Sequence, residues 1–67
     1  MREWLRQIRR IKGMTGAEVA KQVGISQPFY HQIEVGLRDP SPTTAQAIAL
    51  VLGFDWTLFF PPKKKIG

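Results

Sequence analysis

One local pattern recurs four times along this chain: a glycine is followed, two to five residues later, by a side chain that favours the start of a helix. The pairs are Gly13 with Thr15, Gly24 with Ser26, Gly36 with Ser41, and Gly53 with Asp55. Glycine ends helices readily, whereas Ser, Thr and Asp accept hydrogen bonds from the free amides of a helix start. The chain is therefore expected to form short helices separated by tight turns.

Between these signals the apolar residues recur at helical rather than alternating spacing, and strand signals are nearly absent. The expected helices span about residues 2–12, 15–23, 26–35 and 42–52, with a last short turn at 56–59. Residues 1–60 are thus expected to form one all-α domain, a compact bundle of five short helices. Residues 61–67 are expected to form a basic, flexible tail.

The bundle requires each helix to bury one apolar stripe. In the first helix Leu5, Ile8 and Ile11 lie on adjoining turns, with Trp4 beside them. The apolar side chains near residue 60 are available either for the core or for a small dimer contact. Two of them, Trp56 and Leu58, are expected to lie in the core. Because the stripes interlock, little apolar surface is expected to remain exposed.

Charge and composition exclude several classes of function. Ten Lys and Arg against five Asp and Glu give a net charge of +5, which indicates a polyanion or an anionic surface as partner. The chain has no cysteine and one histidine, so neither a disulfide nor a metal site is expected. It has no phosphate-binding glycine loop and no nucleophile motif, so no enzyme, cofactor or small-molecule ligand is expected. With no spanning segment and no signal peptide, a cytoplasmic protein is expected, without a membrane role.

The most specific stretch runs from Gly16 to Val35, where two short helices join at a tight turn. Ala20 is small where the second helix of the pair crosses closely, and Gly24 allows the positive φ angle that reverses the chain. The inward residues are expected to be Val19, Val23, Ile25, Tyr30 and Ile33. Residues 26–29, 31 and 32 are then left facing outward. This arrangement is typical of a helix-turn-helix unit.

This stretch resembles the phage repressor/Cro family of helix-turn-helix domains, and the resemblance extends over roughly residues 2 to 60. It is carried by Arg9, by the segments Gly13–Ala20, Gly24–Ser26 and Ile33–Gly36, and by Pro40 in the following loop. The resemblance implies a lambda-repressor-like fold whose third helix docks in the major groove of double-stranded DNA, usually as a homodimer. It also implies a structural ion pair between Arg9 and Glu34.

Three residues depart from the family pattern. Gly16 stands where many members carry a Gln that bonds a phosphate and braces the third helix, so only backbone amides remain for that role. Tyr30 replaces a small aliphatic residue, so the third helix is either displaced or presents the hydroxyl outward. Pro28 places a rigid surface without a donor where a base is often read.

The expected base readers are Gln27 and Gln32, because a Gln amide pairs with adenine through two hydrogen bonds in the major groove. The alternative is that both are solvated polar residues. Pro28 and Phe29 are candidates for contact with thymine methyl groups, although Phe29 has the alternative of packing inward beside Tyr30.

The expected phosphate contacts are grouped around the helix starts and the basic residues. They are Thr15, Gly16, Ser26, Arg38, Arg10 and Lys21. Thr15 and Ser26 are first of all caps, and Arg38 is equally well read as an ordinary surface charge. His31 is read as an exposed helix residue.

The function expected from these features is sequence-specific double-stranded DNA binding by a small transcription regulator, a repressor in the simplest case. The alternative is a repressor-like protein-interaction module, such as an antitoxin or anti-repressor. A basic amphipathic helix acting at membranes is a third class, and the interlocking apolar stripes argue against it.

Overall fold

The computed structural model describes residues 1–60, which form four α-helices and a 3-10 turn. The elements are α1 (Glu3–Ile11), α2 (Gly16–Val23), α3 (Gln27–Val35), α4 (Pro42–Leu52) and η1 (Trp56–Phe59). The expected all-α bundle of five short helical elements is confirmed. The tail expected at residues 61–67 lies outside the described residues.

The helix starts follow the caps that the sequence indicates. At α2, Thr15 Oγ1 accepts a hydrogen bond from the Glu18 amide at 3.1 Å, and Glu18 Oε1 accepts one from the Thr15 amide at 2.8 Å. This reciprocal pair is a capping box. The remaining side-chain caps are Ser26 on α3, Ser41 on α4 and Asp55 on η1. Local sequence therefore sets the start of every element except α1.

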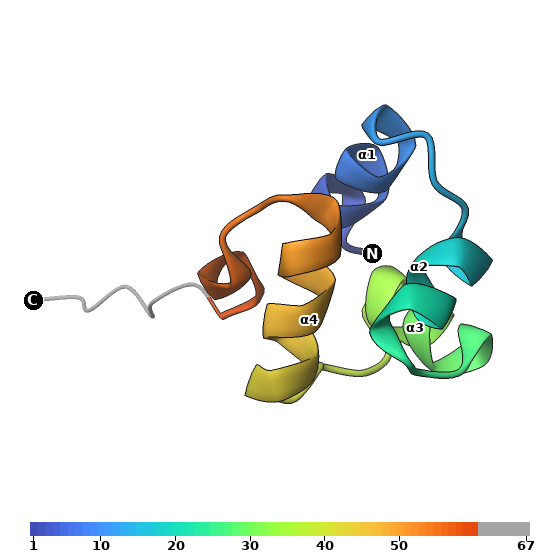
Figure 1. The fold of residues 1–67 in the computed structure, drawn as a ribbon. Coiled ribbons are helices and arrows are strands. Elements are labelled where there is room, and N and C mark those ends of the chain that lie inside the picture. Colours follow the sequence, from blue (N-terminus) through green and yellow to red (C-terminus); the bar gives the residue numbers. More distant parts are fainter. Residues whose placement is uncertain (61–67) are drawn as a thin grey trace, which may run out of the picture.

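The helices surround one core in which α4 stands between η1 and the α2–α3 pair (Figure 1). α2 packs against both α3 and α4, and α1 packs across α3. The buried cluster draws on all five elements: Leu5, Val19, Ala20, Tyr30, Ile33, Ala45, Ile48, Leu52 and Phe59. Since no helix exceeds 11 residues, this shared core rather than helix length stabilises the fold.

The last turn contributes different side chains from those expected. Phe59 is buried and packs against Trp4 of α1 and against Phe54, with ring centroids 5.1 and 5.7 Å apart. Leu58, expected in the core, is 49% exposed, whereas Trp56 is half-buried against the core. The reason is the 3-10 geometry, in which residues three apart lie on one side, so Trp56 and Phe59 point inward together and Leu58 points away.

The expectation for Ile11 is also wrong, because its side chain is 85% exposed. Steps of three residues fall short of a 3.6-residue turn, so each step from Leu5 through Ile8 to Ile11 rotates the side chain by about 60°. Leu5 is fully buried, Ile8 is half-buried, and Ile11 has rotated off the core. More apolar surface is exposed than the sequence indicates, at Met1, Ile11, Leu37, Leu50, Leu58 and Phe60.

Candidate nucleic-acid interface

The two sides of α3 have different tasks. Its inner side buries Tyr30, Ile33 and Glu34, which fix the helix against the rest of the bundle. On its outer side Gln27, Pro28 and His31 are exposed, and Gln32 is half-buried. The start of the helix is held by Ser26, whose Oγ accepts a hydrogen bond from the Phe29 amide at 3.2 Å. A short helix with a rigid start thus presents a row of uncharged side chains to solvent.

The sequence leaves open whether Phe29 packs inward beside Tyr30 or faces outward. Tyr30 is buried, whereas Phe29 is half-buried and packs against the edge of the core. Phe29 therefore offers only part of its ring to an outside partner, and Pro28 remains the exposed apolar side chain at the start of α3.

The Tyr30 side chain takes the space that Gly16 leaves free. A Cβ atom at position 16 would lie 3.5 Å from Tyr30 Cδ2, so the ring passes directly over the first turn of α2. The Tyr30 hydroxyl is not presented outward, because it is buried and without a hydrogen-bond partner in the described structure. Burial, and then the nearby Glu34 carboxylate, raise the pKa of this hydroxyl. In this chain an aromatic contact joins α2 to α3 at the place of the family's glutamine.

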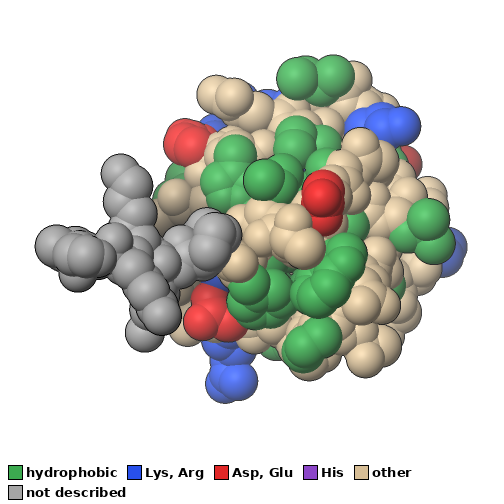
Figure 2. Space-filling model, turned by 90° about the vertical axis from the view of Figure 1, so that its left-hand side faces the viewer, with side chains coloured by type: hydrophobic (Ala, Val, Ile, Leu, Met, Phe, Trp, Pro, Cys, Tyr) green, Lys and Arg blue, Asp and Glu red, His purple; other side chains and the backbone are tan. Residues whose placement is uncertain are grey.

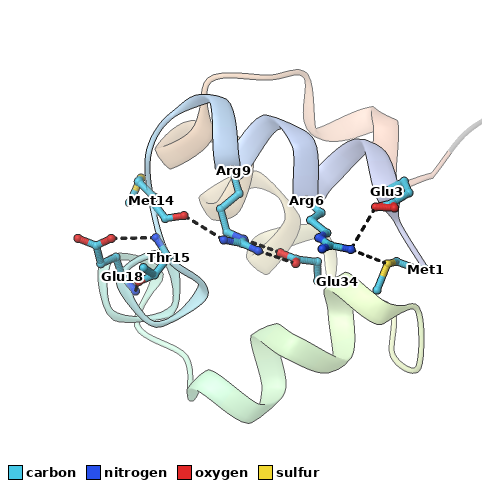
Figure 3. A network of polar contacts seen from close by, with 8 residues as sticks. All are labelled: Met1, Glu3, Arg6, Arg9, Met14, Thr15, Glu18 and Glu34. Atoms are coloured by element: carbon cyan, nitrogen blue, oxygen red, sulfur yellow. Dashed lines mark hydrogen bonds and ion pairs between the residues drawn. The ribbon is translucent and has the colours of Figure 1, made fainter.

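Arg9 and Glu34 form an ion pair that ties α1 to α3 (Figure 3). Arg9 Nε donates to Glu34 Oε2 at 2.8 Å, and the second guanidinium nitrogen donates to Oε1 at 2.9 Å. Arg9 also donates to the Met14 carbonyl at 3.0 Å, which fixes the loop before α2. Burial, the largest single effect, acts to raise the pKa of Glu34, but the hydrogen bonds and charge of Arg9 and the smaller effects of its other neighbours together outweigh burial and lower that pKa.

Every acidic side chain of the chain is already engaged within the fold. Glu3, Glu34 and Asp39 pair with Arg6, Arg9 and Arg2, while Glu18 and Asp55 accept hydrogen bonds at helix starts. In contrast, four basic side chains are exposed and have no ion pair within residues 1–60: Arg10, Lys12, Lys21 and Arg38. The free charge on the described surface is therefore positive.

The expected phosphate contacts are spread over several elements. Thr15 and Gly16 lie at the start of α2, and the contact of Gly16 with Tyr30 brings that start beside α3. Lys21 lies in the last turn of α2 and leads into the turn before Ser26. Arg10 is in the last turn of α1, and Arg38 lies in the loop after α3. Among the expected phosphate contacts, only those at the starts of α2 and α3 are thus held close together by packing within the helix-turn-helix unit.

Arg2 is a functional candidate that sequence reasoning missed. Its side chain is only 15% exposed, and it pairs with Asp39 and donates to the carbonyls of Ile33 and Arg38 at 2.6 and 3.1 Å. These partners lie 31 to 37 positions away along the chain, so no local pattern reveals the contact. The one available signal was an excess of arginine near the start of the first helix.

Residues 1–60 have no cluster of His, Asp and Glu side chains suited to a metal ion, and they enclose no pocket. None of its helices is long and apolar enough to cross a membrane.

Comparison with known proteins agrees with this geometry. A helix-turn-helix family model matches residues 5–59, which is most of the chain. The chain belongs to the Cro/repressor type of helix-turn-helix family. A curated relative is YqaF, an uncharacterized HTH-type transcriptional regulator of Bacillus subtilis (strain 168). It is 48% identical over 60 residues, covering 90% of this chain and 79% of YqaF.

Among solved structures, the N-terminal DNA-binding domain of SinR from Bacillus subtilis matches this helix-turn-helix fold. The TM-score is 0.78 at 23% identity, and the match covers 94% of this chain and 93% of that domain. At this identity the match shows a shared fold. The resemblance of the sequence to the repressor/Cro family is therefore confirmed.

Proposed function

We propose that this chain is a DNA-binding transcription regulator that reads double-stranded DNA in the major groove with the exposed side of α3. Family membership supports the general function. The observation that carries the more specific proposal is the contrast between the two sides of α3. Its inner side is locked by Tyr30, Ile33 and Glu34, while its outer side is exposed and carries no acidic residue.

The base contacts in this proposal come from the first two turns of α3. Gln27 is exposed on the first turn and has the amide that pairs with adenine N6 and N7, worth about 1–3 kcal/mol of discrimination. Gln32, half-buried, adds a contact from the second turn of α3. Pro28 offers an apolar surface to a thymine methyl group, and Phe29 adds the exposed part of its ring.

The phosphate contacts come from around that helix. At the starts of α2 and α3 the proposed contacts are Thr15, Gly16 and Ser26, where free amides and the helix dipole favour an anion. Thr15 contributes its hydroxyl, because its own amide is bound to Glu18. Arg38 is the principal cationic contact, because it lies in the loop directly after α3 and its exposed side chain has no ion pair within residues 1–60. Arg10 and Lys21 add weaker contacts from α1 and α2. These charges supply affinity for any DNA sequence.

We further propose that two copies bind a symmetric site with half-sites about 34 Å apart, one turn of B-DNA. Hydrophobic side chains gather on the face of the molecule that α4 and η1 form (Figure 2). Leu58 of η1 and Phe60, the residue after η1, are 49% and 40% exposed and can be covered by a second copy. Covering a DNA site in this way blocks other proteins from it, so repression is the proposed mode.

The test compares Gln27→Ala with Arg38→Ala on a duplex selected from a random pool and on random duplex DNA. Gln27→Ala is expected to lower affinity for the selected duplex by about tenfold or more while leaving random DNA nearly unchanged. Arg38→Ala is expected to weaken binding to both duplexes alike and to reduce the salt slope by about 1.

Equal effects of the two substitutions on both duplexes would contradict the assignment of α3. Binding that does not depend on salt, or no binding to DNA at all, would instead favour the protein-interaction module, whose apolar contacts are insensitive to counterions.

A further inference from the structure

Arg2 joins three segments that are distant in the sequence. Its amide donates to the Glu34 carbonyl at 2.8 Å and its guanidinium donates to the Ile33 carbonyl at 2.6 Å, so it satisfies two carbonyls at the end of α3. The guanidinium also lies over the Phe59 ring of η1, 5.6 Å from the ring centroid. Arg2 is thereby held by α3 and η1 as well as by the loop that it contacts.

That loop carries Arg38 between α3 and α4. The Arg38 amide donates to the Gln32 carbonyl at 3.2 Å, and the Arg38 carbonyl accepts from Arg2 at 3.1 Å. The backbone of Arg38 is thus held at both its polar groups, while its side chain is exposed. Arg2 therefore helps to fix the backbone of Arg38, whose side chain is an exposed cation.

Asp39 is the second partner of Arg2 in this loop. Its side chain is 77% exposed and its carboxylate pairs with the second guanidinium nitrogen of Arg2. Without this pairing a free negative charge would stand directly beside Arg38, where it would repel a phosphate and compete for the Arg38 guanidinium.

We propose that Arg2 is a positioning residue for DNA binding, which holds residues 37–39 and neutralises Asp39 so that Arg38 meets a phosphate without first being ordered. This inference rests on the proposed function. An ordered contact loses less conformational entropy on binding than a mobile one, so Arg2 adds affinity without touching DNA. Lysine in its place keeps the charge but loses the planar fork that serves several partners at once.

The experiment measures binding to a random-sequence duplex as a function of salt for the wild type, Arg2→Lys, Arg38→Ala and the double variant. Arg6→Lys is the matched control, because Arg6 also lies near the start of α1 and pairs only with Glu3, at 3.6 Å, among the acidic residues. Thermal unfolding of each protein establishes a temperature at which all are folded. Amide hydrogen exchange at residues 37–39 reports the order of the loop directly.

We expect Arg2→Lys to weaken binding by about two- to tenfold at every salt concentration, because the entropy of ordering the loop does not depend on the release of counterions. Arg38→Ala should instead reduce the salt slope by about 1, because it removes a phosphate contact. In the Arg38→Ala background Arg2→Lys should have no further effect on binding. Exchange at residues 37–39 should become faster in Arg2→Lys, and Arg6→Lys should match the wild type in every measurement.

An unchanged affinity in Arg2→Lys, or an equal loss with and without Arg38, would overturn this inference while leaving the proposed function standing. A wild type that does not bind the duplex would overturn both, and faster exchange in Arg2→Lys would then show that Arg2 orders the loop for some purpose other than DNA.

Discussion

Gly16 and Gly24 are both glycines of the helix-turn-helix unit, but they are glycine for different reasons. Gly24 has a φ angle of +87°, which strains any other residue, although nothing lies within 4 Å of a Cβ atom placed there. Gly16 has an ordinary helical backbone, and a Cβ atom there would be in normal contact with Tyr30 at 3.5 Å. Space is therefore available at both positions, and only the backbone distinguishes them.

Alanine substitutions are expected to act in opposite directions at these two positions. Gly16→Ala should stabilise the protein by about 0.4–1 kcal/mol, because it restricts the unfolded chain without straining the folded one. Gly24→Ala should destabilise it by about 1–2 kcal/mol through the left-handed backbone. Thermal unfolding should show a rise of a few degrees for the first and a fall for the second. A fall for Gly16→Ala would mean that Tyr30 packs too closely to accept a methyl group.

The Arg9–Glu34 pair makes stability depend on pH. Because the pKa of Glu34 is lower in the folded chain than its ordinary value of 4.5, the pair contributes fully above that value and is lost as pH falls through the folded pKa. Glu34→Gln should cost about 3 kcal/mol at neutral pH, since it leaves the Arg9 charge poorly solvated. Urea unfolding of the two proteins should give free energies that converge below the folded pKa. A constant difference at all pH values would show that the loss comes from packing instead.

At the scale of the helix, Ser26 and Ser41 form a natural pair for comparison. Each Oγ accepts a hydrogen bond of 3.2 Å from the amide three residues on, and each helix has a proline in its first turn. Ser26→Ala and Ser41→Ala should therefore each destabilise the protein by about 1 kcal/mol. Only Ser26 begins the helix proposed to read DNA, so only Ser26→Ala should shorten the lifetime of the complex with a selected duplex. Equal lifetimes for the two variants would separate the start of α3 from DNA binding.

The bounds of the helices could be predicted from the sequence because caps and glycine stops act over a few residues. Thr15 with Glu18 shows this, since both partners are visible within four positions. What depends on tertiary packing was not predictable, since Arg2 finds partners more than 30 positions away. The exposure of Ile11 could have been predicted, because it follows from the 3.6-residue turn of the helix. In the candidate site, the outer face of α3 could be predicted from helical spacing. The packing of Phe29 could not, because it depends on other elements of the fold.

At the scale of the whole molecule, the exposed apolar residues at the end of the described chain make the proposed dimer testable. Replacing Leu58 and Phe60 together by Ser should reduce cooperative binding of two copies to a duplex with two half-sites by about tenfold, since both side chains lose apolar area to bury. Affinity for a single half-site should stay the same. Ile11→Ser is the control, because Ile11 is 85% exposed at the end of α1.

Sedimentation velocity with and without the duplex measures this cooperativity as the proportion of two-copy complexes. Unchanged cooperativity in the Leu58 and Phe60 variant would exclude this face as the contact, and loss of cooperativity in Ile11→Ser would place the contact at α1.

The central claim is that the outer side of α3 lies in the major groove, and chemical protection of a bound duplex tests it most directly. Guanine N7 lies in the major groove and adenine N3 in the minor groove, so methylation at the two atoms reports the two grooves separately. With a selected duplex saturated by the wild-type protein, we expect guanine N7 to be protected at the G·C pairs of the site while adenine N3 at the A·T pairs of the same site stays reactive. Protection of adenine N3 alone, or of neither atom on a saturated duplex, would contradict the account.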